Sequence, residues 1–281
     1  VAVLSDHREL WVFGTRTTEI WYNSGTVDFP FQRMQGAYIE KGCEAPHSIA
    51  KEDNTVYWLS DDNIVFKASG FQPVRISTHP IENRIGQRNN DAFAYTYVDE
   101  GHSFYVLTLP SKNLTVAYDI ATGLWHERSH IQWGRHHVAS YIHAYGQHLV
   151  GDFQNGLIYQ MSLNQYSDNE DEIRRLAVSP PFHANRNRAI MHRLELDMDS
   201  GVGLPVDQGR DPQVILQWSD DGGKTWSNEH WAAIGRIGRY LTRIFWNRLG
   251  MFRQRQYRIS ISDPVPIAIV GAYAEVENAR H

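Results

Sequence analysis

The chain has 281 residues, of which 42% are hydrophobic and 21% charged, and its net charge is −5. This composition is typical of a globular protein with a substantial core, and the negative charge argues against a dedicated nucleic-acid-binding protein, which would usually be basic. A single cysteine, Cys43, excludes an intramolecular disulfide framework and a cysteine-only metal site, and we expect it to be a small buried hydrophobe. The longest apolar stretch, near Val265–Ala274, is too short to span a bilayer.

Aromatic residues make up 12% of the chain, which favours β-sheets. Short β-rich runs separated by polar turns dominate the first half, and helical periodicity is nearly absent. Four pairs of such runs predict four β-hairpins: Glu9–Gly14 with Thr17–Tyr22, Thr55–Leu59 with Ile64–Ala68, Ser103–Leu109 with Leu114–Ile120, and His148–Asp152 with Leu157–Met161.

The hairpins recur at steps of roughly 46, 48 and 45 residues. A fixed period in this range is typical of propeller blades, which bury their faces by stacking on one another. The third repeat shows four strands, since Ala92–Val98 precedes its hairpin and Leu124–Arg128 follows it. The sequence therefore predicts an all-β, propeller-like fold with antiparallel blades of about 46 residues, and extrapolation over the whole chain gives about six blades.

The period blurs after about Ser167, where the acidic segment Asp168–Glu172 predicts an exposed loop. We therefore expect propeller blades in residues 1–167, and either further blades or a β-sandwich-like domain in residues 168–281. Long strands are predicted at Met191–Met198, Gln213–Trp218, Gln254–Ser262 and Pro266–Val276. The best helix candidate in the chain is His79–Ile85, which we expect to connect two blades.

The sharpest local motif is an Asp-box of the pattern S-x-D-x-G-x-T-W. It consists of Ser219, Asp221, Gly223, Thr225 and Trp226. Asp221 is suited to accept hydrogen bonds from turn amides, Gly223 to adopt positive φ, and Trp226 to pack under the hairpin. Sialidases carry this motif, but their chemistry requires an arginine cluster and a tyrosine nucleophile that cannot be traced here. The motif therefore indicates a structural hairpin rather than a catalytic site.

A second feature is a run of seven arginines without any acidic residue in Ile234–Arg258. They are Arg236, Arg239, Arg243, Arg248, Arg253, Arg255 and Arg258. Alternation along Gln254–Ser262 predicts that several of them share one face of a sheet. We interpret the run as a subunit interface, with a solvated face and a DNA contact as the alternatives.

Histidines cluster at His126, His130, His136, His137 and His143, but their spacing fits no metal signature, and we expect surface or interface residues. No phosphate-binding loop or nucleophile elbow is present. The sequence thus predicts no catalytic residue, no metal and no cofactor.

Several blocks together resemble the packaged-DNA stabilisation proteins, the tail accessory, hub or nozzle proteins of short-tailed bacteriophages. The blocks are Leu10–Trp21, Phe29–Arg33, Gly42–Ser48, Arg75–His79, Tyr118–Arg128 and Asp211–Trp226. Their order and extent, from about Leu10 to Pro264, carry the resemblance. The chain starts abruptly at Val1, and the resemblance implies that the family's N-terminal portion is missing.

The resemblance implies a structural role in the virion, in a six-fold ring below the portal and its adaptor. The ring would extend the DNA channel, retain packaged DNA without binding it specifically, and attach a tail needle or tailspikes, after assembly in the host cytoplasm. Ring closure needs two complementary patches, for which the Asp168–Glu172 loop and the arginine run are candidates. Reversing the charge of Arg253 and Arg255 is then expected to weaken the ring.

Two other functions fit the sequence. The Asp-box is compatible with a glycan-binding or sialidase-like glycan-hydrolysing propeller, which would act on a surface glycan in isolation. A cellular protein-interaction propeller would be a monomer without affinity for portal or adaptor proteins. No membrane partner is expected under any of the three.

Overall fold

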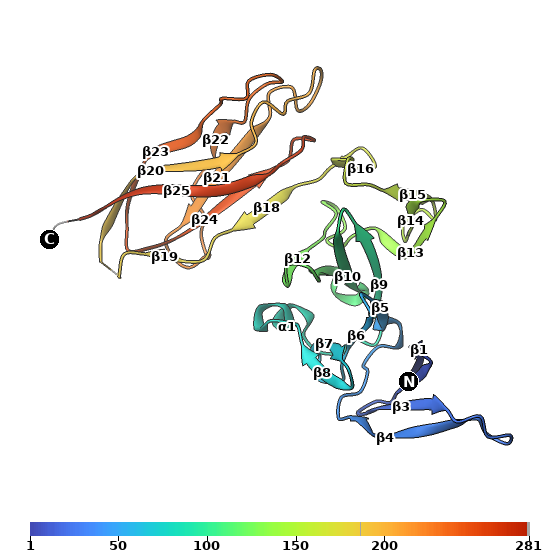
Figure 1. Ribbon diagram of the computed structural model, residues 1–281. Coiled ribbons are helices and arrows are strands. Elements are labelled where there is room, and N and C mark those ends of the chain that lie inside the picture. Colours follow the sequence, from blue (N-terminus) through green and yellow to red (C-terminus); the bar gives the residue numbers. More distant parts are fainter. Residues whose placement is uncertain (186, 280–281) are drawn as a thin grey trace. The chain divides into compact units, whose positions relative to one another are not determined.

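The computed structural model describes residues 1–185 and 187–279, and the chain divides into two units, Val1–Met161 and Ser162–His281. Nearly all regular structure in both units is β-strand, which confirms the predicted fold class (Figure 1). Among the described residues, no helix is long and apolar enough to cross a bilayer.

The N-terminal unit consists of four antiparallel sheets, each built from consecutive strands. The first sheet holds β1 (Ala2–Asp6), β2 (Glu9–Phe13), β3 (Thr18–Asn23) and β4 (Phe31–Ile39). The second sheet holds β5 (Ala50–Glu52), β6 (Thr55–Leu59), β7 (Val65–Ser69) and β8 (Gln72–Arg75), and the third holds β9 (Phe93–Asp99), β10 (His102–Leu109), β11 (Leu114–Asp119) and β12 (Leu124–Glu127). The fourth sheet holds β13 (Val138–Ala144), β14 (Gln147–Asp152) and β15 (Ile158–Met161). The four predicted hairpins are the pairs β2–β3, β6–β7, β10–β11 and β14–β15, and all are confirmed.

Strand β6 shows why the sheets stack as blades. Its alternate residues Val56 and Trp58 belong to a core shared with the first sheet, whereas Tyr57 and Leu59 belong to a core shared with the third. Both faces of the middle blades are therefore buried, because successive side chains of a strand point to opposite faces and a neighbouring blade covers each face. Cys43 lies in the first of these cores and is 2% exposed, which confirms that it is a small buried residue.

Helix α1 (His79–Ile85) follows the second sheet and precedes the third, as predicted. Pro80 occupies the first turn, and Gly86 ends the helix with φ +57°, a conformation that favours glycine. Lys112, at the end of the short 3₁₀ helix η2 (Pro110–Lys112), donates to the carbonyls of Ile85 and Gln87. A second 3₁₀ turn, η1 (Pro46–Ser48), precedes β5.

The C-terminal unit begins with a small hairpin and continues as two larger sheets. The hairpin pairs β16 (Ser167–Asp168) with β17 (Asp171–Glu172). The five-stranded sheet holds β18 (Arg175–Val178), β19 (Phe182–His183), β21 (Gln213–Ser219), β22 (His230–Ala233) and β24 (Gln254–Ile261). The three-stranded sheet has the order β23 (Ile244–Phe252), β20 (Ala189–Met198), β25 (Ile269–Asn278). One core contains residues from both larger sheets, so this unit is a β-sandwich. The extrapolation to six blades is therefore wrong, because the 46-residue repeat ends with the N-terminal unit.

Strand β20 fills much of the sandwich core. Met191 is buried on one side of a β-bulge, and Leu194, Leu196 and Met198 are buried beyond it. The bulge inserts one residue and so shifts which positions face inward. The same strand can thereby contribute four large apolar side chains to one core.

Candidate functional site: the Asp-box hairpin and the arginine-rich segment

The Asp-box forms the turn between β21 and β22. The Asp221 carboxylate accepts hydrogen bonds from the Lys224 amide at 2.9 Å, the Thr225 amide at 3.0 Å and the Thr225 hydroxyl at 2.7 Å. The Ser219 hydroxyl donates to Asp221 at 2.7 Å and accepts the Gly223 amide hydrogen at 2.8 Å. These bonds, those from Thr225 foremost, hold the pKa of Asp221 well below its usual range.

The glycine and tryptophan of the motif complete the turn. Gly222 and Gly223 have φ of +78° and +88°, which a residue with a Cβ rarely adopts. The Trp226 ring lies under the guanidinium of Arg258, 4.3 Å from its carbon, and Arg258 also donates to the Gln217 side chain at 2.6 Å. The polar groups of the motif are thus engaged within the hairpin and its neighbouring strand.

Arg255 is the most deeply buried of the seven arginines, with an exposed fraction of 2%. Its guanidinium donates two parallel hydrogen bonds to the Asp220 carboxylate, at 2.6 and 2.8 Å, and a third to the Leu249 carbonyl at 2.6 Å. Phe252 lies beside the same guanidinium. Asp220 could not be predicted as the partner of Arg255, because it occupies a variable position of the Asp-box, and no local spacing relates it to a residue 35 positions away.

The expectation that arginines of this segment share one sheet face is wrong for Arg255 and Arg258. They are three residues apart on β24, so alternation directs them to opposite faces. Because Arg255 is buried within its own unit, it is not available to a subunit interface. Reversing its charge would disrupt the sandwich, so the expected effect of reversing Arg253 and Arg255 together cannot report on assembly.

The other arginines are exposed. Arg236 pairs with Asp211 and Arg243 with Glu195, both through bidentate hydrogen bonds. The remaining three, Arg239, Arg248 and Arg253, form no ion pair with any residue that the structure describes. The acidic segment Asp168–Glu172 is the β16–β17 hairpin, whose turn residues Asn169 and Glu170 both have positive φ. Its pairing with the arginines of another subunit stays a prediction.

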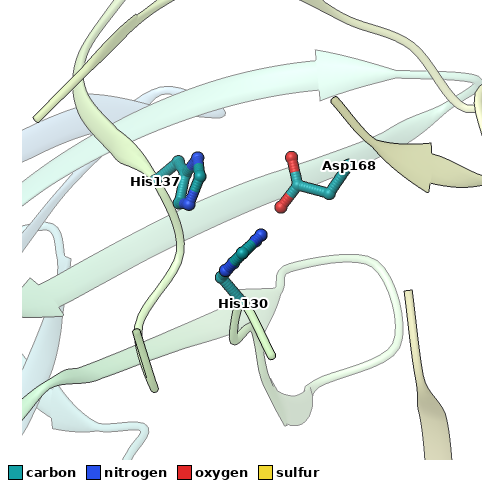
Figure 2. Close-up of side chains that lie close together, drawn as sticks. All are labelled: His130, His137 and Asp168. Carbon is teal, nitrogen blue, oxygen red and sulfur yellow. The ribbon is translucent and has the colours of Figure 1, made fainter. Parts of the chain in front are cut away.

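Three of the clustered histidines lie close together in the N-terminal unit, and one of them is buried. His130 is 3% exposed, and its ring lies beside that of His137 (Figure 2), with 4.1 Å between the ring centres. His137 Nδ1 is 3.1 Å from the Asp152 carboxylate. His136 is partly buried beside them. The prediction of surface histidines is wrong for His130, because the segment between β12 and β13 packs against β11, where Thr115 accepts hydrogen bonds from the amides of Arg128 and His136.

The two rings of Figure 2 are poorly arranged as a pair of metal ligands. The Gln132 amide donates to His130 Nδ1 at 3.2 Å, so in the neutral ring the proton sits on Nε2. The bare Nδ1 of His130 is thus occupied by this amide, and its Nε2–H can donate a hydrogen bond but cannot bind an ion. Asp168, also drawn in Figure 2, belongs to the C-terminal unit, whereas both histidines belong to the N-terminal unit.

His136 leads to a prediction for the pH dependence of stability. Burial, helped by the charge of Arg128, lowers the pKa of His136 to about 3, and its Nδ1 has no partner among the described residues. In the unfolded chain its pKa would be about 6.5. As the pH falls below that value, the unfolded state binds a proton that the folded state does not, so stability is full above about pH 6.5 and falls towards pH 3.

We expect this histidine to contribute up to about 1 kcal/mol per pH unit to that loss. The measurement is urea-induced unfolding of the wild type and of His136→Gln between pH 7 and pH 5. The variant should show a shallower pH dependence. Equal slopes for the two proteins would contradict the assignment.

Comparisons with known proteins agree with the two-unit architecture. The family model described as bacteriophage P22 Gp10, beta-propeller, matches residues 1–166, and the one described as bacteriophage P22 Gp10, beta-sandwich, matches residues 174–277. No curated protein matches the sequence significantly.

Among solved structures, the extracellular domain of a one-component system from B. thetaiotaomicron is 11% identical, with a TM-score of 0.34 over 99% of this chain and 43% of that one. An arabinoxylan arabinofuranohydrolase of glycoside hydrolase family 43 from Bacillus subtilis is 10% identical, with a TM-score of 0.22 over 98% of this chain and 64% of that one. The chain thus spans less than two thirds of either, and scores this low do not show a shared fold. The family models cover both units, and the chain therefore belongs to the bacteriophage P22 Gp10 family, the packaged-DNA stabilisation proteins.

Proposed function

We propose that this virion structural protein forms part of the tail hub, or nozzle, of a short-tailed phage. In this role copies of the chain form a ring, six-fold as in the resemblance, that extends the portal channel and helps to retain the packaged DNA. The ring also offers attachment to a tail needle or tailspikes, and it assembles in the host cytoplasm. The observation that carries the proposal is that both units match one structural phage family.

Electron microscopy tests this role directly. The full chain is mixed with the portal–adaptor assembly of its own phage, and a portal–adaptor assembly of an unrelated phage serves as the control. A ring of added density at the distal end of the cognate assembly alone is the expected result, and it would also give the copy number. Absence of added density at saturating protein would overturn the proposed place in the tail.

A channel protein must let the genome slide, so we expect weak DNA binding. The net charge is −5, two exposed arginines are paired with carboxylates, and Arg255 and Arg258 are engaged internally. The Kd for duplex DNA at physiological salt should be weaker than about 10⁻⁴ M, the weak end of non-specific binding. Fluorescence anisotropy would check this. A micromolar Kd that weakens steeply with salt would instead favour a DNA-contact role for the arginines.

The glycan-processing alternative gains no support from the Asp-box. Ser219, Asp221 and Thr225 bond to one another and to amides of their own turn. The motif therefore acts as a turn-forming element here. Screening the isolated chain against sialosides and host polysaccharides would reveal such an activity if the tail-hub role failed.

A further inference from the structure

The loop between β22 and β23 exposes three large apolar side chains. In this segment, called the 236–243 loop below, Ile237 is 62% exposed, Tyr240 71% and Leu241 96%. Large apolar residues grouped at one exposed site are typical of protein interfaces.

The backbone of the 236–243 loop is held in place. The Ser200 hydroxyl donates to the Tyr240 carbonyl at 2.7 Å, and the Thr242 hydroxyl donates to the Arg239 carbonyl at 2.9 Å. A Cβ at Gly235 would lie 2.6 Å from the Thr242 hydroxyl, and one at Gly201 would lie 2.9 Å from the Arg239 backbone, so both glycines permit the close approach. A loop fixed in this way loses little conformational entropy when a partner binds.

A second apolar patch lies on β25, an edge strand. Ile269 is 44% exposed, Val270 74% and Tyr273 64%; these three residues are called the β25 patch. Strand β25 pairs with β20 along one side, and no described strand pairs with its other side. A long apolar edge strand of this kind is a ready surface for another chain.

The two patches lie at the same level on opposite edges of one sheet. Strand β20 runs between β23 and β25 (Figure 1), and its residue Leu196 pairs with Ile244 on one side and with Ala272 on the other. Ile244 directly follows the 236–243 loop, and Ala272 lies between Val270 and Tyr273 of the β25 patch. A neighbouring copy placed beside the first could therefore bring its loop against the first copy's β25.

The charges around the patches differ in sign. Arg239 in the 236–243 loop has no ion-pair partner among the described residues, whereas Arg236 and Arg243 on either side of it are already paired with Asp211 and Glu195. Near the β25 patch, Asp197 pairs in register with Gly271, and Glu275 follows Tyr273 on the strand; both carboxylates are exposed, and neither forms an ion pair within the described part of the chain. Contact between two copies of the same patch would place charges of like sign against each other. Contact between the 236–243 loop and the β25 patch instead brings opposite charges together.

We propose that the 236–243 loop of one copy binds the β25 patch of a second copy. Leu241 and Tyr240 then cover the exposed edge strand, and Arg239 approaches the carboxylates beside it. Because the contact joins two different patches, each copy can bind a further copy in the same way. The series of copies closes into a ring where the rotation between neighbouring copies allows it. This inference deepens the proposed function by naming the surfaces through which the ring's subunits meet, and it can be tested without the portal.

Chemical cross-linking between two separately made variants tests the contact. Leu241→Cys and Val270→Cys are each prepared in the full chain and treated with a short bis-maleimide, alone and mixed. The native Cys43 does not interfere, because it is buried and burial raises the pKa of its thiol to about 11. The mixture should give a cross-linked dimer that neither variant gives alone, and a chain with both cysteines should give a ladder of oligomers.

The exposed Glu229→Cys, mixed with Val270→Cys, measures the background from random collisions. Dimers formed by either variant alone would show a symmetric contact and overturn the proposal, as would a mixture no more cross-linked than this control. Loss of portal binding with cross-linking intact would instead count against the tail-hub role alone.

A second measurement uses Leu241→Asp, which cannot disturb the core because the side chain is 96% exposed. Sedimentation should show self-association at least about tenfold weaker than in the wild type, since a central apolar anchor is lost. Val27→Asp, at a fully exposed position of the N-terminal unit, is the matched control and should associate like the wild type. Equal association of Leu241→Asp and the wild type would overturn the proposal.

Discussion

Replacing Trp58 with alanine should lower the free energy of unfolding of the N-terminal unit by about 3–5 kcal/mol, as for other large aromatic residues removed from a core. Trp58 is completely buried between the first and second sheets. Its ring meets Phe13 of the first sheet at 5.7 Å and Phe66 of its own sheet at 5.8 Å between centroids. Its indole N–H donates to the Gly42 carbonyl at 3.1 Å.

The large effect has two causes. Alanine would leave a cavity at a junction between two blades, and the Gly42 carbonyl would lose its donor in a buried place. Trp58→Phe distinguishes the two causes, since phenylalanine fills most of the volume of the indole ring but has no N–H to donate. We expect that variant to lose about 1–2 kcal/mol.

Urea-induced unfolding, with hydrogen exchange of the β6 amides to localise the change, measures both variants. The control is Trp133→Ala, because Trp133 is 41% exposed and the same chemical change there should cost less than about 1 kcal/mol. If Trp58→Ala and Trp133→Ala lost similar stability, the two-blade core around Trp58 would be disproved.

Replacing Arg255 with methionine should lower the free energy of unfolding of the C-terminal unit by about 2–3 kcal/mol. Methionine fills much of the same volume but cannot donate to Asp220 or to the Leu249 carbonyl. Asp220 can then turn to water, because its side chain is 45% exposed, but the Leu249 carbonyl loses a buried donor. For this reason the expected loss is smaller than that for breaking a fully buried ion pair.

The matched control is Arg253→Met. Arg253 lies two residues from Arg255 and its side chain is exposed, so this variant should change the free energy of unfolding by less than about 0.5 kcal/mol. Arg255→Lys should recover little of the loss, since an ammonium group cannot reproduce the two parallel hydrogen bonds to Asp220. Chemical unfolding with hydrogen exchange of the β24 amides measures all three. Equal stability of the Arg253 and Arg255 variants would show that the buried pair is not formed.

The sequence by itself determined the features that depend on near neighbours in the chain. Alternation and turn residues located the four hairpins and four long strands of the second half, although they missed β23, and the short helix was predicted at its observed residues 79–85. The Asp-box predicted its own hydrogen bonds, because every donor and acceptor lies within a few residues of Asp221. Block order along the chain also identified the family.

Only the tertiary structure decided which side chains are buried and by what. It showed that the blade repeat gives way to a sandwich, that His130 is interior, and that Arg255 belongs to the core while Arg239 does not. The pairing of Arg255 with Asp220 joins residues 35 positions apart. Burial depends on which element packs across from a residue, and that element is set by the packing of whole sheets, which local alternation does not specify.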